Sequence, residues 1–479
     1  MKQRATLKTV TMIIAAILSI FSFGASSTIL TEIPATPPTM LFPNPSLGVE
    51  TSSPDNKIPL IFDDDGSRDG TVALLYLLNI PEVSVKAITI SYGEAHPDVY
   101  AQHTSRMLDY IGVQGIPIGA GQDKPIGEGI AFPDWLRQAS NNFWDFSLPK
   151  TGKAIPVEDA PELMVSTINQ SSEPVIIFLS GTFTNLAQAL HLDPSIAKNI
   201  KAVYFMGGAV KVPGNITNLL PDSQNKVAEW NIIADPQAAK EVFESDLDLF
   251  MVPLDATGKV LLEKTDIFPW HQGDSKAELA ADLYDIMYDA YGFKQTEIFD
   301  LTAAVLMAKP ELCEFEPYHL DVVVVSGNTF GQTKIDTNSE PNVQACLKPE
   351  ADLIIQELND HFSGAGSSEL GQTPSINPLI GVWKGSVLNK DFKMNITVTI
   401  KEACQLNQVC GGFDISTVSC SGKFTWIGMD QDMYQFQASD LTKACGQGKD
   451  YLSPQEDGTL LYISRGDYGE TKGILKKNP

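Results

Sequence analysis

A short apolar run that breaks into a cluster of aspartates constrains the fold of this chain more than any other feature. Residues 59–62 (Pro-Leu-Ile-Phe) have the pattern of a buried strand, and aspartates follow at positions 63 to 65 and at 69. Residues 71–78 then have the pattern of an amphipathic helix. The sequence therefore predicts a βα unit with the acidic turn at the carboxyl end of its strand, which is where open α/β sheets carry their functional sites.

Clustered carboxylates repel one another unless positive charge lies among them. The turn is therefore predicted to bind a hard cation or a cationic reaction intermediate. The alternative is a solvated acidic turn that only caps the following helix, and that interpretation would suit an isolated turn of this kind. The remainder of the chain favours the functional interpretation over the structural one.

Residues 58–362 alternate short β-branched runs with longer helical patterns. Strands are indicated at residues 83–90 and 175–179, and helices at residues 99–111 and 185–192. This alternation predicts an α/β fold, a Rossmann-like and mainly parallel sheet with helices on both faces.

Changes in composition divide the rest of the chain. Residues 27–57 are rich in Pro, Ser and Thr and are predicted to be an extended linker, and a second linker is expected at residues 363–376. Residues 377–479 lack helical periodicity, and their short strand patterns predict a small all-β barrel or sandwich with an accessory or binding role.

The amino terminus has the layout of a secretory signal. Basic residues precede an apolar run over residues 10–25, and small residues follow it, so residues 1–26 are predicted to be a signal peptide that is cleaved near Ser26. An uncleaved amino-terminal anchor is the alternative. The formal net charge of −25 argues against nucleic acid as a partner, because phosphates would be repelled. We expect a secreted or extracytoplasmic protein, and the sequence leaves a homo-oligomer open.

The six cysteines fall into even groups within the predicted domains. An even count in each domain of an exported protein predicts disulfide bonds inside each domain. The expected pairs are Cys313 with Cys346, Cys404 with Cys410 and Cys420 with Cys445, the last two being the simplest of three connectivities. Metal binding by thiolates is the alternative, and the absence of CxxC spacing disfavours it.

The acidic turn also matches a known motif. Asp63-x-Asp65-x-x-x-Asp69 resembles the DxDxxxDD signature of the inosine-uridine-preferring nucleoside hydrolases. Further segments between residues 58 and about 360 resemble that family in the same order. They are Ser180 to Ala187, Met206 to Ala209, Gly214-Asn215, Val227 to Pro236, Met251 to Thr257 and Ile298 to Ala304.

The resemblance implies a hydrolase that uses Ca²⁺-activated water to cleave the N-glycosidic bond of small-molecule ribonucleosides. Such a reaction passes through a ribosyl cation, so negative charge near the sugar and an activated water are both needed. By resemblance, Asp65 is a calcium ligand and the general base, Thr184 supplies a carbonyl ligand, and Asp300 is a further ligand. Asp69 is expected to complete the metal set in place of a ligand that this chain lacks.

The remaining matches fall on positions that bind substrate in the family. The resemblance assigns ribose contacts to polar side chains and places Met206 beside them, while the aromatic Trp230 is available to stack on sugar or base. The expected substrate-binding residues are Asp69, Glu94, Met206, Asn215, Glu229, Trp230 and Asn231.

Three positions depart from the family pattern. Gly70 stands where the family has a second adjacent aspartate that binds calcium, which leaves Asp69 or Asp64 to take over that ligand. Phe299 stands where the inosine-uridine subgroup has a histidine that can protonate the leaving base, and Glu94 replaces an asparagine that contacts ribose. The alternative function is therefore a non-catalytic receptor for ribosides or sugars with a degenerate metal site.

Overall fold

The computed structural model describes the chain from residue 57 onward, with gaps. The described residues are 57–148, 157–363, 377–390, 392–401, 408–430, 433–442, 445–446, 448–455, 458–466 and 469–478. The predicted signal peptide and Cys404 lie outside these residues, as do the two predicted linkers apart from Lys57 and Ser363. Within the described part of the chain, no helix is both long enough and apolar enough to span a membrane.

A nine-stranded sheet forms the centre of the first domain, with the strand order β10-β13-β7-β6-β5-β1-β2-β3-β4. All neighbours pair in parallel except β10 and β13, which are antiparallel. The strands are β1 (Ile58–Asp64), β2 (Val83–Ile90), β3 (Ile118–Ala120), β4 (Val157–Asp159), β5 (Val175–Leu179), β6 (Ile200–Met206), β7 (Leu249–Val252), β10 (Cys313–Tyr318) and β13 (Val343–Pro349). The predicted mainly parallel sheet is confirmed.

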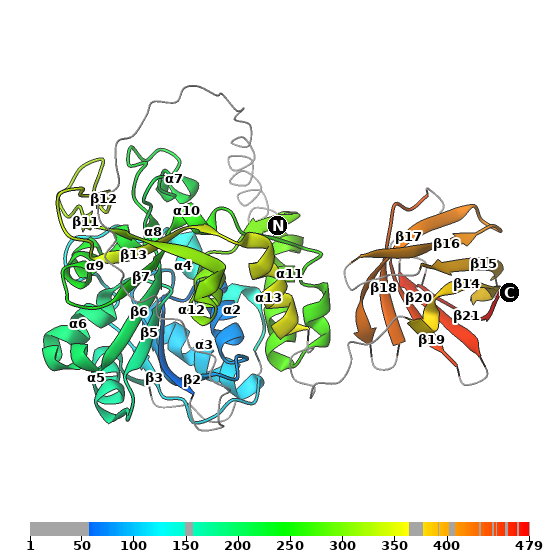
Figure 1. Ribbon diagram of the computed structural model, residues 1–479, viewed down its shortest axis with the longest axis horizontal. Coiled ribbons are helices and arrows are strands. Elements are labelled where there is room, and N and C mark those ends of the chain that lie inside the picture. Colours follow the sequence, from blue (N-terminus) through cyan, green and yellow to red (C-terminus); the bar gives the residue numbers. More distant parts are fainter. Residues whose placement is uncertain are drawn as a thin grey trace, which may run out of the picture.

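Helices cover both faces of this sheet (Figure 1). They are α2 (Arg68–Leu77), α3 (Pro97–Tyr110), α4 (Asp134–Asn141), α5 (Ala160–Gln170), α6 (Thr184–Leu192), α7 (Ile216–Leu219), α8 (Trp230–Ala234), α9 (Pro236–Phe243), α10 (Leu254–Thr257), α11 (Ser275–Tyr291), α12 (Asp300–Ala308) and α13 (Ala351–Phe362). Short elements connect them: η1 (Phe143–Asp145), η2 (Pro194–Asn199), η3 (Phe268–Gln272) and η4 (Pro310–Leu312), with the two-stranded pairs β8 (Leu261–Glu263) with β9 (Gln295–Glu297) and β11 (Leu320–Val322) with β12 (Thr333–Ile335).

The strand β1 shows why its sequence occupies the middle of this arrangement. Leu60 and Phe62 pack into the core with α2, α11 and α12, whereas Ile61 packs into the opposite core with α5 and α6. A strand whose neighbours cover both faces must be apolar on both, which explains the continuous apolar run. The chain runs from β1 to β2, β3 and β4 on one side and returns to β5 on the other, so a topological switch point lies beside β1.

The second domain is a closed antiparallel barrel in which each strand pairs with the next and β21 returns to β14. Its strands, preceded by η5 (Asn377–Leu379), are β14 (Gly381–Asn389), β15 (Phe392–Ile400), β16 (Val409–Ile415), β17 (Cys420–Asp430), β18 (Met433–Ser439), β19 (Gly448–Pro454), β20 (Thr459–Gly466) and β21 (Gly469–Lys477). The prediction of a small β domain is confirmed, and closure decides for the barrel.

Alternation within β15 explains how the barrel interior is filled. Met394, Ile396, Val398 and Ile400 are buried, and the residues between them are partly or fully exposed. Closure pairs every strand on both sides and leaves no open edge. Residues from the other strands complete this core, and the Trp383 indole Nε1 donates a 2.7 Å hydrogen bond to the Leu379 carbonyl.

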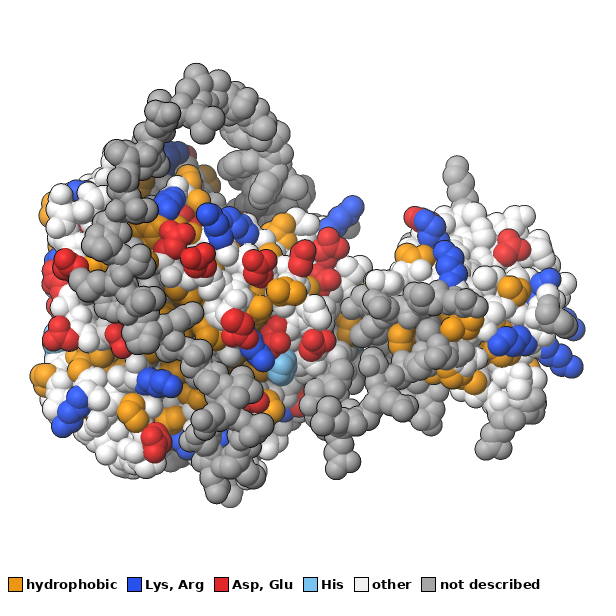
Figure 2. Space-filling model, in the orientation of Figure 1, with side chains coloured by type: hydrophobic (Ala, Val, Ile, Leu, Met, Phe, Trp, Pro, Cys, Tyr) orange, Lys and Arg blue, Asp and Glu red, His pale blue; other side chains and the backbone are white. Residues whose placement is uncertain are grey.

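Two of the three predicted disulfides lie within the described residues. Cys313 is bonded to Cys346 in the first domain and Cys420 to Cys445 in the barrel, so both pairings are confirmed. The third predicted pair includes Cys404, which lies outside the described residues, so this pairing stays a prediction. Figure 2 shows acidic side chains spread over the visible face of the α/β domain, in keeping with the negative net charge of the chain.

Candidate active site

The acidic turn lies where β1 ends and α2 begins, at the switch point of the sheet. Ser67 caps α2, because its Oγ accepts a 2.7 Å hydrogen bond from the backbone N of Gly70. Gly66 has a φ of 91°, a conformation that suits glycine and turns the chain from the strand into the helix. Asp63 supports the turn from below, since its Oδ1 accepts hydrogen bonds from Thr89 Oγ1 at 2.6 Å and Asn185 Nδ2 at 2.7 Å.

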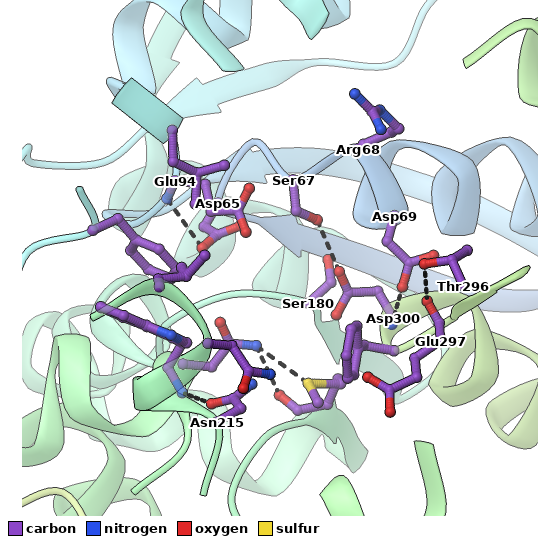
Figure 3. A pocket seen from close by; sticks show the side chains of 18 of the residues that line it. Asp65, Ser67, Arg68, Asp69, Glu94, Ser180, Asn215, Thr296, Glu297 and Asp300 are labelled. Atoms are coloured by element: carbon purple, nitrogen blue, oxygen red, sulfur yellow. Dashed lines mark hydrogen bonds between the residues drawn. The ribbon is translucent and has the colours of Figure 1, made fainter. Parts of the chain in front are cut away.

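A pocket of about 380 Å³ opens above this turn (Figure 3). Nine of the ten residues expected from the sequence line it, drawn from strand ends and loops that are far apart along the chain. They are Asp65, Asp69, Glu94, Met206, Asn215, Glu229, Trp230, Asn231 and Asp300. Thr184 does not line the pocket. It is the first residue of α6, and its Oγ1 donates a 2.6 Å hydrogen bond to Asp235 Oδ2.

Asp65 has an unsatisfied carboxylate oxygen inside the protein. The residue is 1% exposed, its Oδ2 accepts a 3.2 Å hydrogen bond from the backbone N of Glu94, and its Oδ1 is buried without a hydrogen-bond partner (Figure 3). Burial raises the pKa of Asp65 well above its ordinary value, and the charge of Glu94 raises it further. A buried carboxylate oxygen without a partner is costly, so this geometry calls for a proton, a water or a cation.

Asp69 and Asp300 are linked by the start of α12. Asp69 Oδ2 accepts a 2.6 Å hydrogen bond from the backbone N of Asp300, and Asp69 Oδ1 accepts a 2.5 Å bond from the Tyr284 hydroxyl. Asp300 Oδ2 in turn accepts a 2.8 Å bond from Ser67 Oγ. Burial is the largest cause that raises the pKa of both carboxyl groups, and it raises that of Asp300 well above its ordinary value.

A second group of residues faces the turn from the loop before α8. Glu229 caps this helix: its Oε1 accepts from the backbone N of Asn231 at 2.9 Å, and its Oε2 accepts from Gly208 N at 2.9 Å. Asn231 Nδ2 donates a 3.2 Å bond to the Met206 carbonyl, and Asn215 Oδ1 accepts a 3.1 Å bond from Trp230 N. These bonds hold the polar side chains rigidly along one side of the pocket.

Aromatic side chains form the wall above the polar residues. The ring of Trp230 stacks on Phe132 with 4.6 Å between centroids, and the Arg68 guanidinium lies 4.9 Å from the centre of the Trp144 ring. All four of these side chains line the pocket. Trp135 lies between Phe132 and Trp144 in the sequence, but it is 45% exposed and is not among the lining residues. The pocket therefore has an acidic floor, formed by Asp65, Asp69 and Asp300, and an aromatic wall. This combination suits a polar sugar attached to a flat base.

Sequence reasoning missed several residues of the site. Ser67 carries a helix-capping signal that points to its position, and Ser180 lies within a motif that the sequence resemblance already covered. Tyr284 carries no such signal: it lies in the middle of α11, 215 residues from the Asp69 carboxylate that it contacts. Only the tertiary fold brings that hydroxyl to the acidic floor.

The donor set of the floor suits a hard cation. Asp65 and Asp300 supply buried carboxylates, Asp69 supplies a partly buried one, and Asp65 Oδ1 has no hydrogen-bond partner. Oxygen ligands of this type are those that calcium prefers. Elsewhere among the described residues, His319, Asp321 and Asp336 bring their ligand atoms within 4.8 Å of one another. That group lies around β11 and β12 and shares no residue with the pocket.

Comparisons with known proteins identify relatives of the first domain. The family described as inosine-uridine preferring nucleoside hydrolase matches residues 60–356. The pyrimidine-specific ribonucleoside hydrolase RihA of Citrobacter koseri is 31% identical over 315 residues, which cover 63% of this chain and 98% of that protein. RihA of Salmonella typhi is 30% identical over 315 residues, with the same 63% and 98% coverage.

Solved structures share the fold of the same domain. The purine-preferring ribonucleoside hydrolase from Gardnerella vaginalis superposes with a TM-score of 0.56 at 24% identity, covering 64% of this chain and 98% of that one. The plant nucleoside hydrolase PpNRh1 gives a TM-score of 0.55 at 24% identity, with 64% and 99% coverage. The barrel extends beyond the family match.

Proposed function

The chain belongs to the inosine-uridine preferring nucleoside hydrolase family and is an N-ribosyl hydrolase, and from this premise we propose that it is an exported, calcium-dependent enzyme. It hydrolyses the N-glycosidic bond of ribonucleosides and releases ribose and the free base. The observation that carries the calcium proposal is the buried Asp65 Oδ1 at the pocket, which has no hydrogen-bond partner.

The acidic floor provides the groups that such a reaction needs. Asp65 and Asp300 line the pocket and would hold the cation, with carboxylate oxygens of the type that calcium prefers. Calcium bound there would supply a Lewis acid that lowers the pKa of a coordinated water. Asp65 then accepts the proton of the attacking water, and the surrounding carboxylates stabilise positive charge as it develops on the ribose.

The side facing the floor positions the sugar and the base. Glu229 and Asn231 are fixed by hydrogen bonds to backbone atoms, so their remaining polar capacity is oriented towards the pocket for ribose hydroxyls. Trp230 and Phe132 offer a stacked aromatic surface to the base. Phe299 lines the pocket beside Asp300 and cannot donate a proton, so the base must depart with little acid assistance from this position.

Ribose release over a panel of nucleosides tests the activity. Uridine and cytidine come first in the panel, because the relatives RihA are named as pyrimidine-specific, and inosine, adenosine and guanosine follow. We expect release that stops when a calcium chelator is added and resumes when calcium is restored. Binding of ribosides without release from any substrate would contradict the proposal and support the receptor alternative.

Export is supported by the disulfides Cys313–Cys346 and Cys420–Cys445, because such bonds persist in oxidising compartments. Cell fractionation followed by mass spectrometry of the amino terminus tests this part. We expect protein in the extracytoplasmic or secreted fraction, with cleavage near Ser26. Reduced cysteines in a cytoplasmic protein with an intact terminus would contradict it.

A further inference from the structure

The space beside Gly70 is already filled by another side chain. Gly70 lies in the first turn of α2 and faces the end of β1. A Cβ atom added to Gly70 would overlap Asp64 Oδ1, and it would lie 2.9 Å from Asp64 Cγ and 2.7 Å from Ser67 Oγ. Non-bonded carbon atoms pack at about 3.5 to 4.0 Å, so no side chain fits there while Asp64 and Ser67 keep these positions. The Asp64 carboxylate therefore occupies the volume that a side chain at position 70 would occupy.

Asp64 contacts the pocket residue Ser180 from this position, although Asp64 is not itself among the residues that line the pocket. It is 2% exposed, and its Oδ1 accepts a 2.9 Å hydrogen bond from Ser180 Oγ, a residue that lines the pocket. The neighbouring Ser67 Oγ donates to Asp300 Oδ2 at 2.8 Å. Each carboxylate oxygen has two lone pairs, so the bonds from Ser180 and from the backbone N of Gly66 leave Asp64 able to bind a further partner.

Asp69 does not fill the same space. Its Oδ1 accepts from Tyr284 Oη at 2.5 Å, and its Oδ2 accepts from the backbone N atoms of Asp300 at 2.6 Å and Leu301 at 3.4 Å. Asp69 is thus committed to the start of α12, on the side of the turn that faces α11. Of the two residues that could compensate for Gly70, only Asp64 places a carboxylate against it.

We propose that Asp64 supplies the metal-binding carboxylate that Gly70 lacks, so that the calcium site keeps its number of acidic ligands although one has moved six positions earlier in the chain. This inference rests on the proposed calcium dependence. The independent sign of a ligand at this floor is Asp65 Oδ1, which belongs to a residue that is 1% exposed, lines the pocket and has no hydrogen-bond partner for that atom.

The arrangement makes the two positions depend on each other. Asp64→Ala removes one carboxylate from the site. Gly70→Asp alone places a second carboxylate in a volume that Asp64 already fills, so it is expected to destabilise the turn and not to tighten calcium binding. Combining the two substitutions returns one carboxylate to that volume. The effects of the single substitutions should therefore be strongly non-additive.

Calcium titration by isothermal calorimetry on the full chain tests the inference. The proteins are the wild type, Asp64→Ala, Gly70→Asp and the double variant Asp64→Ala/Gly70→Asp. We expect Asp64→Ala to weaken calcium affinity by roughly tenfold or more, and the double variant to recover most of that loss. Asp64→Asn keeps the volume and the Ser180 contact while it removes the charge, so it serves if the alanine variant fails to fold. Asp222→Ala, at an exposed position of the same domain, controls for net charge.

The outcomes separate the inference from the proposed function. If the wild type binds no calcium by calorimetry, the proposed calcium dependence fails and the inference fails with it. If the wild type binds calcium and both Asp64 variants bind it equally well, the proposed function stands and the inference alone is overturned. Recovery in the double variant, together with lower thermal stability of Gly70→Asp without calcium, supports the exchange of ligand positions.

Discussion

Each domain buries an aspartate, and the two aspartates differ in how their oxygens are satisfied. In the barrel, Asp450 is 3% exposed, its Oδ1 accepts a 2.6 Å hydrogen bond from the Tyr462 hydroxyl, and Ser464 bonds it as well. In the α/β domain, Asp65 is 1% exposed, and its Oδ1 is buried without a partner. Burial raises the pKa of both, to about 6 for Asp450 and well above the ordinary value for Asp65.

The difference lies in what surrounds each carboxyl group. Asp450 receives its hydrogen bonds from neighbouring side chains, and burial is the cause that raises its pKa. The charges of Glu94, Asp64 and Glu229 all raise the pKa of Asp65, and its Oδ1 has no hydrogen-bond partner among the described residues. Folding alone satisfies the Asp450 carboxyl group, whereas the Asp65 carboxyl group still needs a proton, a water or a cation.

Substituting the two buried aspartates should break this comparison most clearly. Asp65→Asn removes the proposed metal ligand and general base, so we expect kcat for ribose release to fall about a thousandfold or more with the fold retained. Asp450→Asn should leave kcat within about twofold and lower the thermal stability of the barrel, because it weakens a satisfied buried network. Steady-state kinetics and thermal unfolding of both variants measure these effects. Equal losses of kcat in the two variants would erase the distinction.

Phe299 should give a smaller effect, which concerns protonation of the departing base. Phe299 lines the pocket and cannot donate a proton, so p-nitrophenyl riboside, whose leaving group needs no proton, should turn over faster than inosine by roughly tenfold or more. Phe299→His should narrow this ratio by raising turnover of inosine. Parallel assays of both substrates with both proteins measure it. A ratio near one in the wild type would mean that another group already protonates the base.

The stability of the two domains should also depend differently on pH. Burial, the largest cause, raises the pKa of Asp63 to about 8, of Asp64 to about 7 and of Glu94 to about 8. Raised carboxyl pKa values mean that the folded protein binds more protons than the unfolded chain, so without calcium the α/β domain should lose stability as pH rises from about 4 through about 8. Added calcium should raise Tm by several degrees at pH 8 and by less at pH 5.

Differential scanning calorimetry at pH 5, 6, 7 and 8, with and without calcium, measures this prediction. The barrel serves as the internal control, because Asp450 is the only buried carboxyl group among its described residues, and the pKa of Asp450 is about 6. Its transition should not shift with calcium. A calcium shift of the same size at every pH would contradict the coupling of metal binding to proton release.

Removing the barrel should have the smallest effect. Every residue that lines the pocket comes from the α/β domain, so a chain that ends at Ser363 should keep kcat and KM within about twofold. Ribose release by the truncated and full chains, at equal calcium, measures it. If truncation abolished turnover while the α/β domain stayed folded and bound calcium, the barrel would have to contribute to the site.

Local patterns in the sequence predicted the framework of the α/β domain. The strands at 83–90 and 175–179 coincide with β2 and β5, because their apolar, β-branched residues are buried on the pleated sheet. The boundaries of α2 were less accurate, since the helix begins at Arg68 rather than Thr71. Ser67 caps it earlier than the apolar periodicity indicates, and the first turn carries site residues instead of core residues.

Some residues of the candidate site could likewise be predicted from local sequence, and others could not. Asp65, Glu229 and Asn231 lie at strand ends and helix caps, where short motifs specify the backbone and therefore the direction of the side chain. The contact between Tyr284 and Asp69 depends on how α11 packs against α2, which no local pattern encodes. The choice between barrel and sandwich was likewise open, because it depends on whether β21 pairs with β14.

The position of the Asp64 carboxylate beside Gly70 also restricts how these two residues can change during evolution. A lineage that gains an aspartate at position 70 while Asp64 remains must displace the Asp64 side chain, which should destabilise the turn. A lineage that loses Asp64 first must pass through an ancestor with one acidic group fewer at the floor. Positions 64 and 70 should therefore change together among homologues. A search that only compares aspartates position by position will count this metal site as incomplete, although the same number of carboxylates surrounds it in space.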